Sequence, residues 1–355
     1  MAQRLVFVDA LRGLALVLMV LNHTARWWLP RSLGLPRFEL IYVTLTLAAP
    51  VFLFLVGFGV ALSARRAGGA RLTGAGLLAY WRRGLGIVLA GLLLNVLVFP
   101  EDPWWSGGVL QTIGLGIIVA APLLPLAARR SGQGALALGA VFMYLAFAWA
   151  HPWLVAWLPA HSLVAQVLFF DFAPWPWVAI VVLGLVAGAL WTEAERRSDT
   201  AQARYVAGML VAGAALVVLF LGHAWWNGLD PLRGYERDFS LNRHWLPRGV
   251  TLFWIVGMIG MLFAAMHWLA EVRRLPMGWL VTFGRTAMML YFVHQVIAYR
   301  LGKQTFALSF DSWWAYAGAN LLFLALLLGL AELWLRLKPR LRRPRPLAAP
   351  ASGAA

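Results

Sequence analysis

The amino-acid sequence predicts an all-α, polytopic membrane protein with about ten transmembrane helices in one bundle. Of the 355 residues, 62% are hydrophobic and only 12% are charged. A soluble domain carries about 25% charged and about 45–50% apolar residues. Long apolar stretches alternate along the chain with short segments rich in Arg, Pro or Gly, which is the pattern of successive membrane spans. The composition therefore excludes an ordinary soluble helical protein.

Each predicted span is an apolar stretch of about 17–24 residues, the length that crosses a bilayer. We expect the first span to be retained rather than cleaved as a signal, because Asp9 and Arg12 interrupt it and no small-residue cleavage site follows. The predicted spans cover residues 5–28, 40–63, 80–99, 108–127, 134–157, 174–192, 205–222, 249–270, 279–300 and 313–336. No internal repeat is obvious, so the sequence does not favour an inverted-repeat transporter.

The distribution of basic residues predicts the orientation in the membrane. Most Lys and Arg residues lie before the first span, in loops that follow even-numbered spans, or after the last span. The positive-inside rule therefore places both termini in the cytoplasm. We expect residues 1–337 to form one transmembrane domain and residues 338–355, rich in Pro and Arg, to form a disordered basic tail. Abundant Arg beside scarce Lys is typical of a GC-rich bacterial genome, and we expect a multi-pass protein of the bacterial cytoplasmic (inner) membrane.

The composition also excludes several kinds of function. There is no cysteine, so disulfides, thiolate catalysis and cysteine metal sites are excluded. The His residues show no metal-ligand spacing, and we expect no metal. The net charge of +16 is spread over short interhelical segments, which fits membrane topology better than nucleic-acid binding.

The first span carries three polar side chains that point to a functional site. At 100° per residue, Asp9, Arg12 and His23 fall within about 60° of one helix face. Charged side chains inside a membrane are costly unless they face the protein interior or a wet cavity. This polar stripe therefore predicts the wall of a site.

Four polar residues are expected at similar depth in the extracytoplasmic half. His23 ends the first span, about 27 Å from its start at 1.5 Å per residue. His294 lies in the outer half of the ninth span, Gln111 in the first turn of the fourth, and Asp171 just before the sixth. Four segments thus contribute to one candidate catalytic cluster.

Five segments resemble, in order, the heparan-alpha-glucosaminide N-acetyltransferase-like family of transmembrane acyltransferases and the related acyltransferase family 3. The first is the D-x-L-R-G…H pattern of the first helix, formed here by Asp9, Arg12, Gly13 and His23. The other similar segments are residues 48–57 (AAPVFLFLVG), 108–114 (GVLQTIG), 171–178 (DFAPWPWV) and 284–294 (GRTAMMLYFVH). Together the segments reach from the first to the ninth span.

The resemblance implies a membrane acetyltransferase. Cytosolic acyl-CoA, acetyl-CoA above all, would donate its acyl group to an amine or hydroxyl of an extracytoplasmic sugar or glycan. The animal enzyme's proposed catalytic histidine lies in the loop after the first helix. This sequence has no histidine between Thr24 and Glu39, so that residue is not carried over. His23 instead lies at the end of the helix, as in acyltransferase family 3. The sequence leaves open whether the acyl group is transferred directly or through an acyl-enzyme intermediate. It also leaves open whether the protein forms a homodimer.

The chemistry of acyl transfer suggests a role for each residue of the candidate catalytic cluster. It needs a general base and donors that stabilise an oxyanion, and neutral imidazole is a suitable base near pH 7. We expect His23 to be the base and His294 or Gln111 to polarise the thioester carbonyl. Asp171 either orients His23 or caps the sixth span.

The arginines expected in the cytoplasmic half of the bundle have two interpretations. Arg12 either pairs with Asp9 one helical turn away or holds CoA phosphates together with Arg285. The candidate residues for the remaining CoA phosphate, which membrane topology alone also explains, are Arg65, Arg66, Arg82 and Arg83.

Two other functions stay open from the sequence. A transporter or exporter of a lipid-linked or sugar substrate would use the polar stripe as a path, with His23 relaying protons. A non-catalytic membrane scaffold would use it for packing. Acyl-CoA binding would distinguish an acyltransferase from both.

Overall fold

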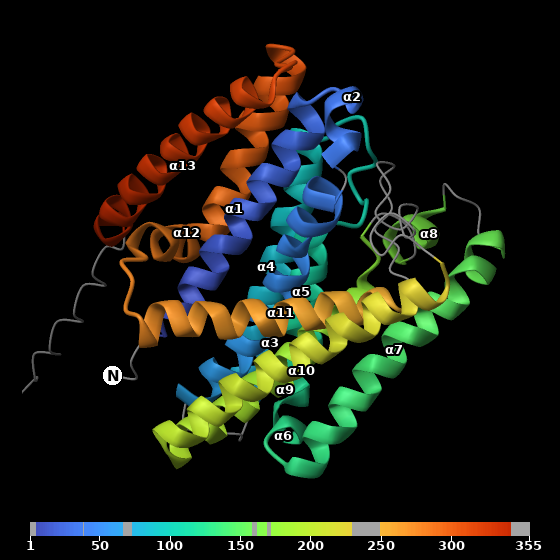
Figure 1. The fold of residues 1–355 in the computed structure, drawn as a ribbon, viewed down its shortest axis with the longest axis vertical. Helices are drawn as coiled ribbons and strands as arrows, with labels where there is room; N and C mark the ends of the chain where they lie inside the picture. Colours follow the sequence, from blue (N-terminus) through green and yellow to red (C-terminus); the bar gives the residue numbers. More distant parts are fainter. Residues whose placement is uncertain are drawn as a thin grey trace, which may run out of the picture.

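The computed structural model describes residues 5–37, 39–66, 73–157, 162–168, 172–228 and 249–341. Within these ranges the chain forms helices and no strand (Figure 1). Ten helical segments there are long and apolar enough to span a membrane: Val6–Trp28, Leu45–Arg65, Gly74–Val98, Val109–Ala127, Arg130–Leu154, Pro174–Arg197, Asp199–Trp226, Thr251–Val272, Gly278–Thr305 and Trp313–Lys338. The predicted fold class is confirmed, and the chain is a multi-pass membrane protein.

The long helices follow the predicted order. They are α1 (Val6–Trp28), α3 (Ala48–Arg66), α4 (Gly74–Val98), α5 (Val109–Ala120), α7 (Arg130–Trp157), α9 (Pro174–Arg197), α10 (Asp199–Trp226), α11 (Thr251–His267), α12 (Gly278–Gln295) and α13 (Trp313–Leu341). Short helices α2 (Arg31–Gly34), α6 (Leu124–Ala127) and α8 (Leu163–Leu168) lie in the connections. A π-helical segment, η7 (Val296–Thr305), continues α12.

Two helices begin earlier than the hydropathy pattern predicts. The third span starts at Gly74 rather than at residue 80, and the seventh at Asp199 rather than at residue 205. The side chains of Thr73 and Ser198 cap these helices by accepting hydrogen bonds of 3.1 Å from the backbone N–H three residues later. N-capping starts a helix in the polar interface, ahead of its apolar stretch. At the other end of the chain, α13 continues to Leu341, and residues 342–355 lie outside the described residues.

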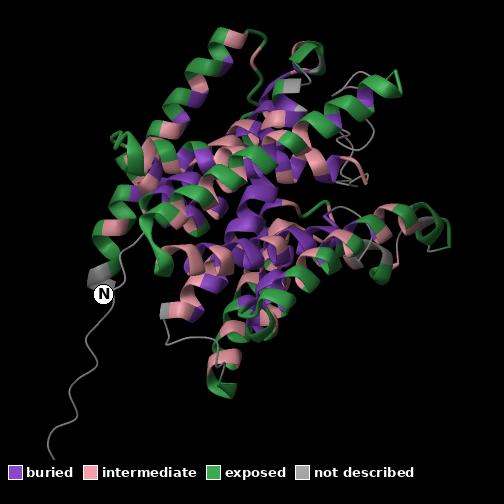
Figure 2. Cartoon of the chain, turned by 60° about the horizontal axis from the view of Figure 1, so that its bottom comes forward, coloured by how far each residue is buried: buried purple, intermediate pink, exposed green. Residues whose placement is uncertain are grey.

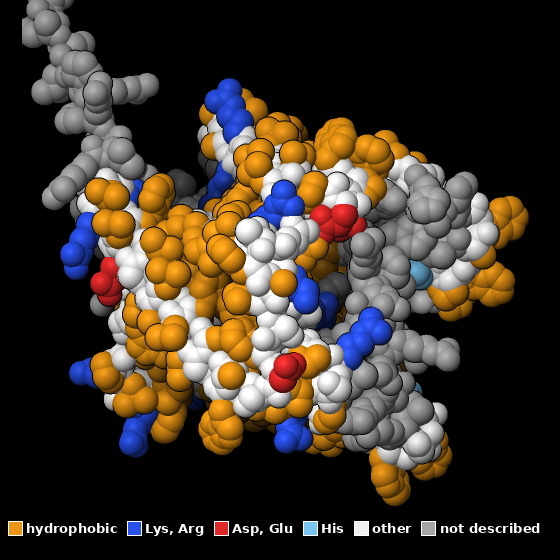
Figure 3. Space-filling view, turned by 90° about the horizontal axis from the view of Figure 1, so that it is seen from above, with side chains coloured by type: hydrophobic (Ala, Val, Ile, Leu, Met, Phe, Trp, Pro, Cys, Tyr) orange, Lys and Arg blue, Asp and Glu red, His pale blue; other side chains and the backbone are white. Residues whose placement is uncertain are grey.

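The bundle has buried helices at its centre and helices with largely unburied residues at its periphery. Most residues of α1, α3 and α9 are buried, whereas most residues of α4, α7, α10 and α13 are not. Figure 2 shows this concentration of buried residues at the centre, and Figure 1 places α7 and α13 on opposite sides of the bundle. Hydrophobic side chains cover much of the face in Figure 3, with Lys, Arg, Asp and Glu side chains scattered among them. An apolar outer surface is what contact with acyl chains requires.

Helices α1 and α12 run in the same direction and touch through their backbones. A Cβ atom added to Gly13 would lie 1.9 Å from the Leu280 carbonyl oxygen, and one added to Gly284 would lie 1.9 Å from the Asp9 carbonyl oxygen. Small residues at a membrane helix interface permit this close approach. Both glycines belong to the segments that carry the family resemblance, and their contact brings the polar faces of the two helices together.

Candidate active site

The two candidate histidines form one pair between α1 and α12. The Nδ1 atom of His23 lies 2.9 Å from the Nε2 atom of His294. Their rings stack at a centroid distance of 5.2 Å and an interplanar angle of 10°. The His294 side chain is fully buried, and His23 is partly buried. The structure therefore joins two residues that are 271 positions apart in the sequence.

The hydrogen bonds of the pair fix its tautomers. His294 Nδ1 lies 2.8 Å from the Leu290 carbonyl oxygen, which can only accept a hydrogen bond. Nδ1 of His294 therefore carries its proton, and in the neutral ring Nε2 accepts. His23 must then donate from Nδ1, so that its Nε2 atom carries a lone pair. This arrangement is that of a base held in orientation by a second group.

Three hydrogen bonds fix the end of α1 that carries His23. The amide of Asn22 donates to the Ile41 carbonyl oxygen at 2.7 Å, and the indole of Trp28 donates to the Ala298 carbonyl oxygen at 3.0 Å. The Thr24 hydroxyl donates to the Asn320 side chain on α13 at 2.7 Å. Hydrogen bonds to other segments, made one residue before, one residue after and five residues after His23, thus hold this end of α1 in place.

An aromatic cluster of Trp27, Phe99 and Tyr299 covers His23. The Trp27 ring stacks on His23 at a centroid distance of 4.9 Å. Tyr299 lies 5.0 Å from the Trp27 ring and 4.9 Å from the Phe99 ring. Its hydroxyl donates a short hydrogen bond to the carboxylate of Glu101, which lies between α4 and α5. Ring contacts thus link His23, through Trp27, to Tyr299 and its partner Glu101 in the α4–α5 connection.

The Glu101 carboxylate keeps its charge at neutral pH. Partial burial raises the pKa of Glu101, but hydrogen bonds from Tyr299 and Gln304 and the charge of Arg300 outweigh burial and hold the pKa below its ordinary value. A lowered pKa means that these contacts are present at neutral pH and are lost only as the pH falls through that lowered pKa.

A large cavity reaches from the expected cytoplasmic half toward the histidine pair. Its volume is about 710 Å³, and α1, α3, α4, α5 and α12 form its walls. Arg12, Arg83 and Arg285 line it together with Asp9. Most of the remaining wall is apolar, and it ends at Leu110 and Tyr291. The Tyr291 ring contacts the His294 ring edge to face, with centroids 5.8 Å apart.

A smaller, more polar cavity lies beyond this end. Its volume is about 210 Å³, and its polar lining residues are Asn95, Asp102, Ser106, Gln111, Tyr291 and Gln295. The Gln111 amide donates to the Ser106 carbonyl oxygen at 3.2 Å. Neither His23 nor His294 lines either of these two cavities. The structure thus places Gln111 in the wall of the small cavity, and within the described residues no hydrogen bond joins it to either histidine ring.

The sequence alone leaves the roles of Arg12 and Asp171 open. Arg12 Nη1 lies 3.1 Å from Asp9 Oδ1, so the intrahelical ion pair forms, and both residues also face the large cavity. Asp171 lies outside the described residues. The next residue, Phe172, accepts a 3.3 Å hydrogen bond from the Thr112 hydroxyl.

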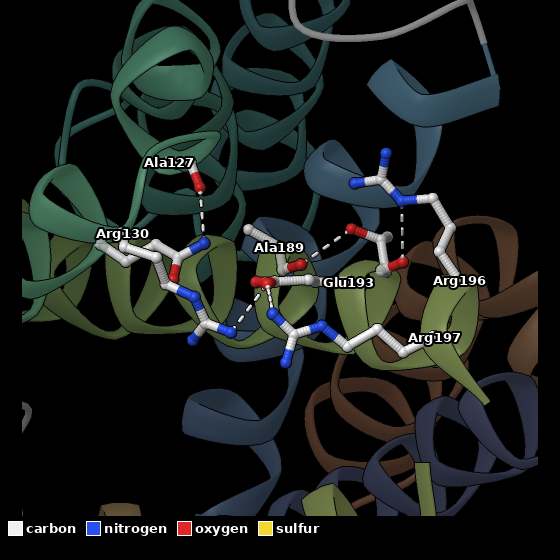
Figure 4. A network of polar contacts seen from close by, with 8 residues as sticks. Ala127, Arg130, Ala189, Glu193, Arg196 and Arg197 are labelled. Carbon is white, nitrogen blue, oxygen red and sulfur yellow. Dashed lines mark hydrogen bonds and ion pairs between the residues drawn. The ribbon is translucent and has the colours of Figure 1, made fainter. Parts of the chain in front are cut away.

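The other predicted cations do not gather around the cavity. Arg65 forms an ion pair with Glu195 on α9, and Arg82 is exposed and lines neither cavity. Arg66 ends α3, and the position of its side chain is outside the described part of the structure. A second ion network lies nearby on α9, where the guanidinium groups of Arg130 and Arg197 converge on Glu193 at 2.7 and 2.5 Å (Figure 4). Topology and helix pairing account for these residues.

Sequence reasoning missed the residues that link the cavities to the histidines. Leu110 and Tyr291 belong to segments that carry the family resemblance but have no predicted role, and nothing in the sequence marks Trp27, Phe99 or Tyr299. The spacing holds one usable signal, because Tyr291 lies three residues before His294 and therefore shares its helix face. Contacts between distant aromatic residues leave no comparable signal.

Comparison with known proteins identifies the family. No curated protein matches the chain. The family model described as heparan-alpha-glucosaminide N-acetyltransferase, catalytic, matches residues 4–225, more than half of the chain. His23, Arg12, Arg83 and Gln111 lie within the matched region, whereas the α12 residues of the site follow it. The chain therefore belongs to the heparan-alpha-glucosaminide N-acetyltransferase catalytic family, and this membership implies acetyltransferase activity.

Proposed function

We propose that this protein transfers an acetyl or other short acyl group from cytosolic acyl-CoA to a sugar or glycan on the opposite side of a bacterial cytoplasmic membrane. The observation that carries the proposal is the position of the histidine pair. The pair lies beside Tyr291, which lines the large cavity. The same cavity is lined by three arginines, Arg12, Arg83 and Arg285. Such a cavity matches a donor with a charged head and a long, uncharged arm.

The donor would bind in the large cavity. Guanidinium groups bind phosphate oxygens in bidentate geometry, so we assign the CoA phosphates to Arg12, Arg83 and Arg285. Arg285 precedes Tyr291 by six residues on α12, which is about 9 Å along the helix. The pantetheine arm would follow this apolar wall and bring the thioester to Tyr291, beside His294.

The acceptor would be activated by His23. The lone pair on its Nε2 atom takes the proton of the acceptor hydroxyl or amine as the acceptor oxygen or nitrogen attacks the thioester carbonyl. The resulting imidazolium keeps its Nδ1–H bond to His294. Collapse of the tetrahedral intermediate breaks the C–S bond, and the CoA sulfur leaves with the proton from His23. The acyl group thus passes directly from CoA to the acceptor, with no acyl-enzyme intermediate.

The remaining roles follow from which donors are available. Both ring nitrogens of His294 are engaged, by Leu290 and by His23, so we assign His294 to orienting the base rather than to polarising the carbonyl. Gln111 keeps a second amide N–H and is the oxyanion donor in this proposal. The polar lining of the small cavity suits sugar hydroxyls, and the aromatic cluster over His23 would move aside for the acceptor.

Arg83 and Arg285 are expected to bind the donor. Replacing either residue with glutamine should weaken acetyl-CoA binding about tenfold or more, because a hydrogen bond to a charged group contributes about 1.5–3 kcal/mol. Isothermal titration of the purified protein with acetyl-CoA measures this. Arg82→Gln is the matched control, since Arg82 is adjacent to Arg83 but lines neither cavity. Equal weakening by Arg82→Gln would contradict a specific phosphate contact.

The reaction itself can be tested with radiolabelled acetyl-CoA. Protein reconstituted in vesicles should pass label to an enclosed amino sugar or glycan, when the donor is added on the side of the N-terminus. Acetyl-CoA should also raise the melting temperature of the detergent-solubilised protein, because a ligand that binds only the folded state stabilises it. Absence of both label transfer and stabilisation would rule out the acyltransferase and favour the transporter.

A further inference from the structure

The two cavities meet at a pair of buried side chains. Leu110 on α5 and Tyr291 on α12 are the two residues common to the linings of the large and the small cavity. Their exposed fractions are 2% and 8%. A group that extends from the large cavity into the small one therefore passes these two side chains.

The packing around this constriction is tight. A Cβ atom added to Gly91 on α4 would lie 3.0 Å from Leu110 Cβ and 2.6 Å from the Gln111 side-chain oxygen. Helix α4 thus presses against α5 at Leu110, while the Tyr291 ring rests on His294. Close-packed side chains do not give way without cost, so the width of the constriction is built into the bundle.

We infer that Leu110, opposite Tyr291, sets the length of the acyl group that the enzyme transfers. This inference rests on the proposed function, because it needs the thioester to lie beside His294. In that position the acyl group occupies the constriction. An acetyl group ends there, whereas each further methylene has to enter the small cavity, whose volume is about 210 Å³ and whose lining includes the polar side chains of Asn95, Asp102, Ser106, Gln111 and Gln295. Leu110 is therefore a specificity-determining residue.

The test compares donors of increasing acyl length. Acetyl-, butyryl- and hexanoyl-CoA are offered with glucosamine, and release of the CoA thiol reports transfer to the sugar or to water. The wild-type protein should prefer acetyl- over butyryl-CoA by about tenfold or more in kcat/KM, since one methylene in a tight pocket discriminates by about 10–200-fold. Leu110→Ala should bring this ratio close to one, chiefly by raising kcat/KM for butyryl-CoA.

Ile117→Ala is the matched control. Ile117 lies two helical turns from Leu110 on α5, has the same exposed fraction of 2%, and lines only the large cavity of the two. The two substitutions remove the same number of carbon atoms. Ile117→Ala should therefore leave the acetyl-to-butyryl ratio at its wild-type value, and melting temperatures verify that both variants fold. Leu110→Val, which removes one methylene, should shift the ratio in the same direction by a smaller factor.

The outcomes separate this inference from the proposed function. If the wild-type protein releases CoA and Leu110→Ala and Leu110→Val keep its acyl-length preference, Leu110 does not set acyl length although the enzyme is an acyltransferase. An equal shift in Ile117→Ala would likewise overturn the inference, because any enlargement of the large cavity would then suffice. If the wild-type protein neither binds these donors nor releases CoA, the proposed function fails, and the inference fails with it.

Discussion

His23→Ala is expected to lower the rate of acyl transfer about 10²–10⁴-fold, the usual contribution of a general base. The variant should bind acetyl-CoA as tightly as the wild-type protein, because His23 lines neither cavity and lies beyond the end of the donor site. Transfer of radiolabel at saturating acetyl-CoA measures the rate, and titration measures the affinity. A change confined to the rate assigns His23 to the chemical step.

The pair is expected to act as a unit. Because His294 works through His23, the double variant His23→Ala, His294→Ala should be no slower than His23→Ala alone. His151→Ala provides the control, since His151 lies on the outer helix α7 and lines neither cavity. The general-base assignment would be abandoned if His23→Ala kept wild-type activity, or if the two histidine substitutions had additive effects.

Gly284→Ala is expected to damage both stability and activity. Its Cβ atom would lie 1.9 Å from the Asp9 carbonyl oxygen, so α1 and α12 would have to separate. Overpacking of a core typically costs about 1–3 kcal/mol, and here the obstacle is backbone that cannot rotate away. Separation of the helices would also lengthen the 2.9 Å contact between His23 and His294. We expect a lower melting temperature in detergent and a loss of acyl transfer.

Gly278→Ala separates this effect from helix propensity. Gly278 begins the same helix, and a Cβ atom there meets nothing within 4 Å. Alanine is favoured over glycine in a helix by about 1 kcal/mol, so Gly278→Ala should be neutral or stabilising and should retain activity. Equal melting temperatures for the two variants would show that α1 and α12 do not depend on the glycine contact.

The sequence shows which residues are chemically suited to the site, but not which of them meet. Asp9, Arg12 and His23 share a helix face by periodicity alone, and their cost in a membrane marks them as functional. Arg83, by contrast, looks no different in sequence from Arg65 and Arg82. Only the packing of the helices shows that Arg83 lines the cavity and that Arg65 pairs with Glu195.

By itself, the sequence determined the all-α class, the number and order of the spans, and the polar face of α1. These features depend on apolar length and helical periodicity, which are local properties of the chain. The tertiary structure alone decided that His23 meets His294, that Leu110 and Tyr291 line both cavities, and that the Trp27 ring of an aromatic cluster stacks on His23. The physical reason is that each of these contacts joins helices far apart in the chain, and its geometry depends on close packing at residues such as Gly13 and Gly284.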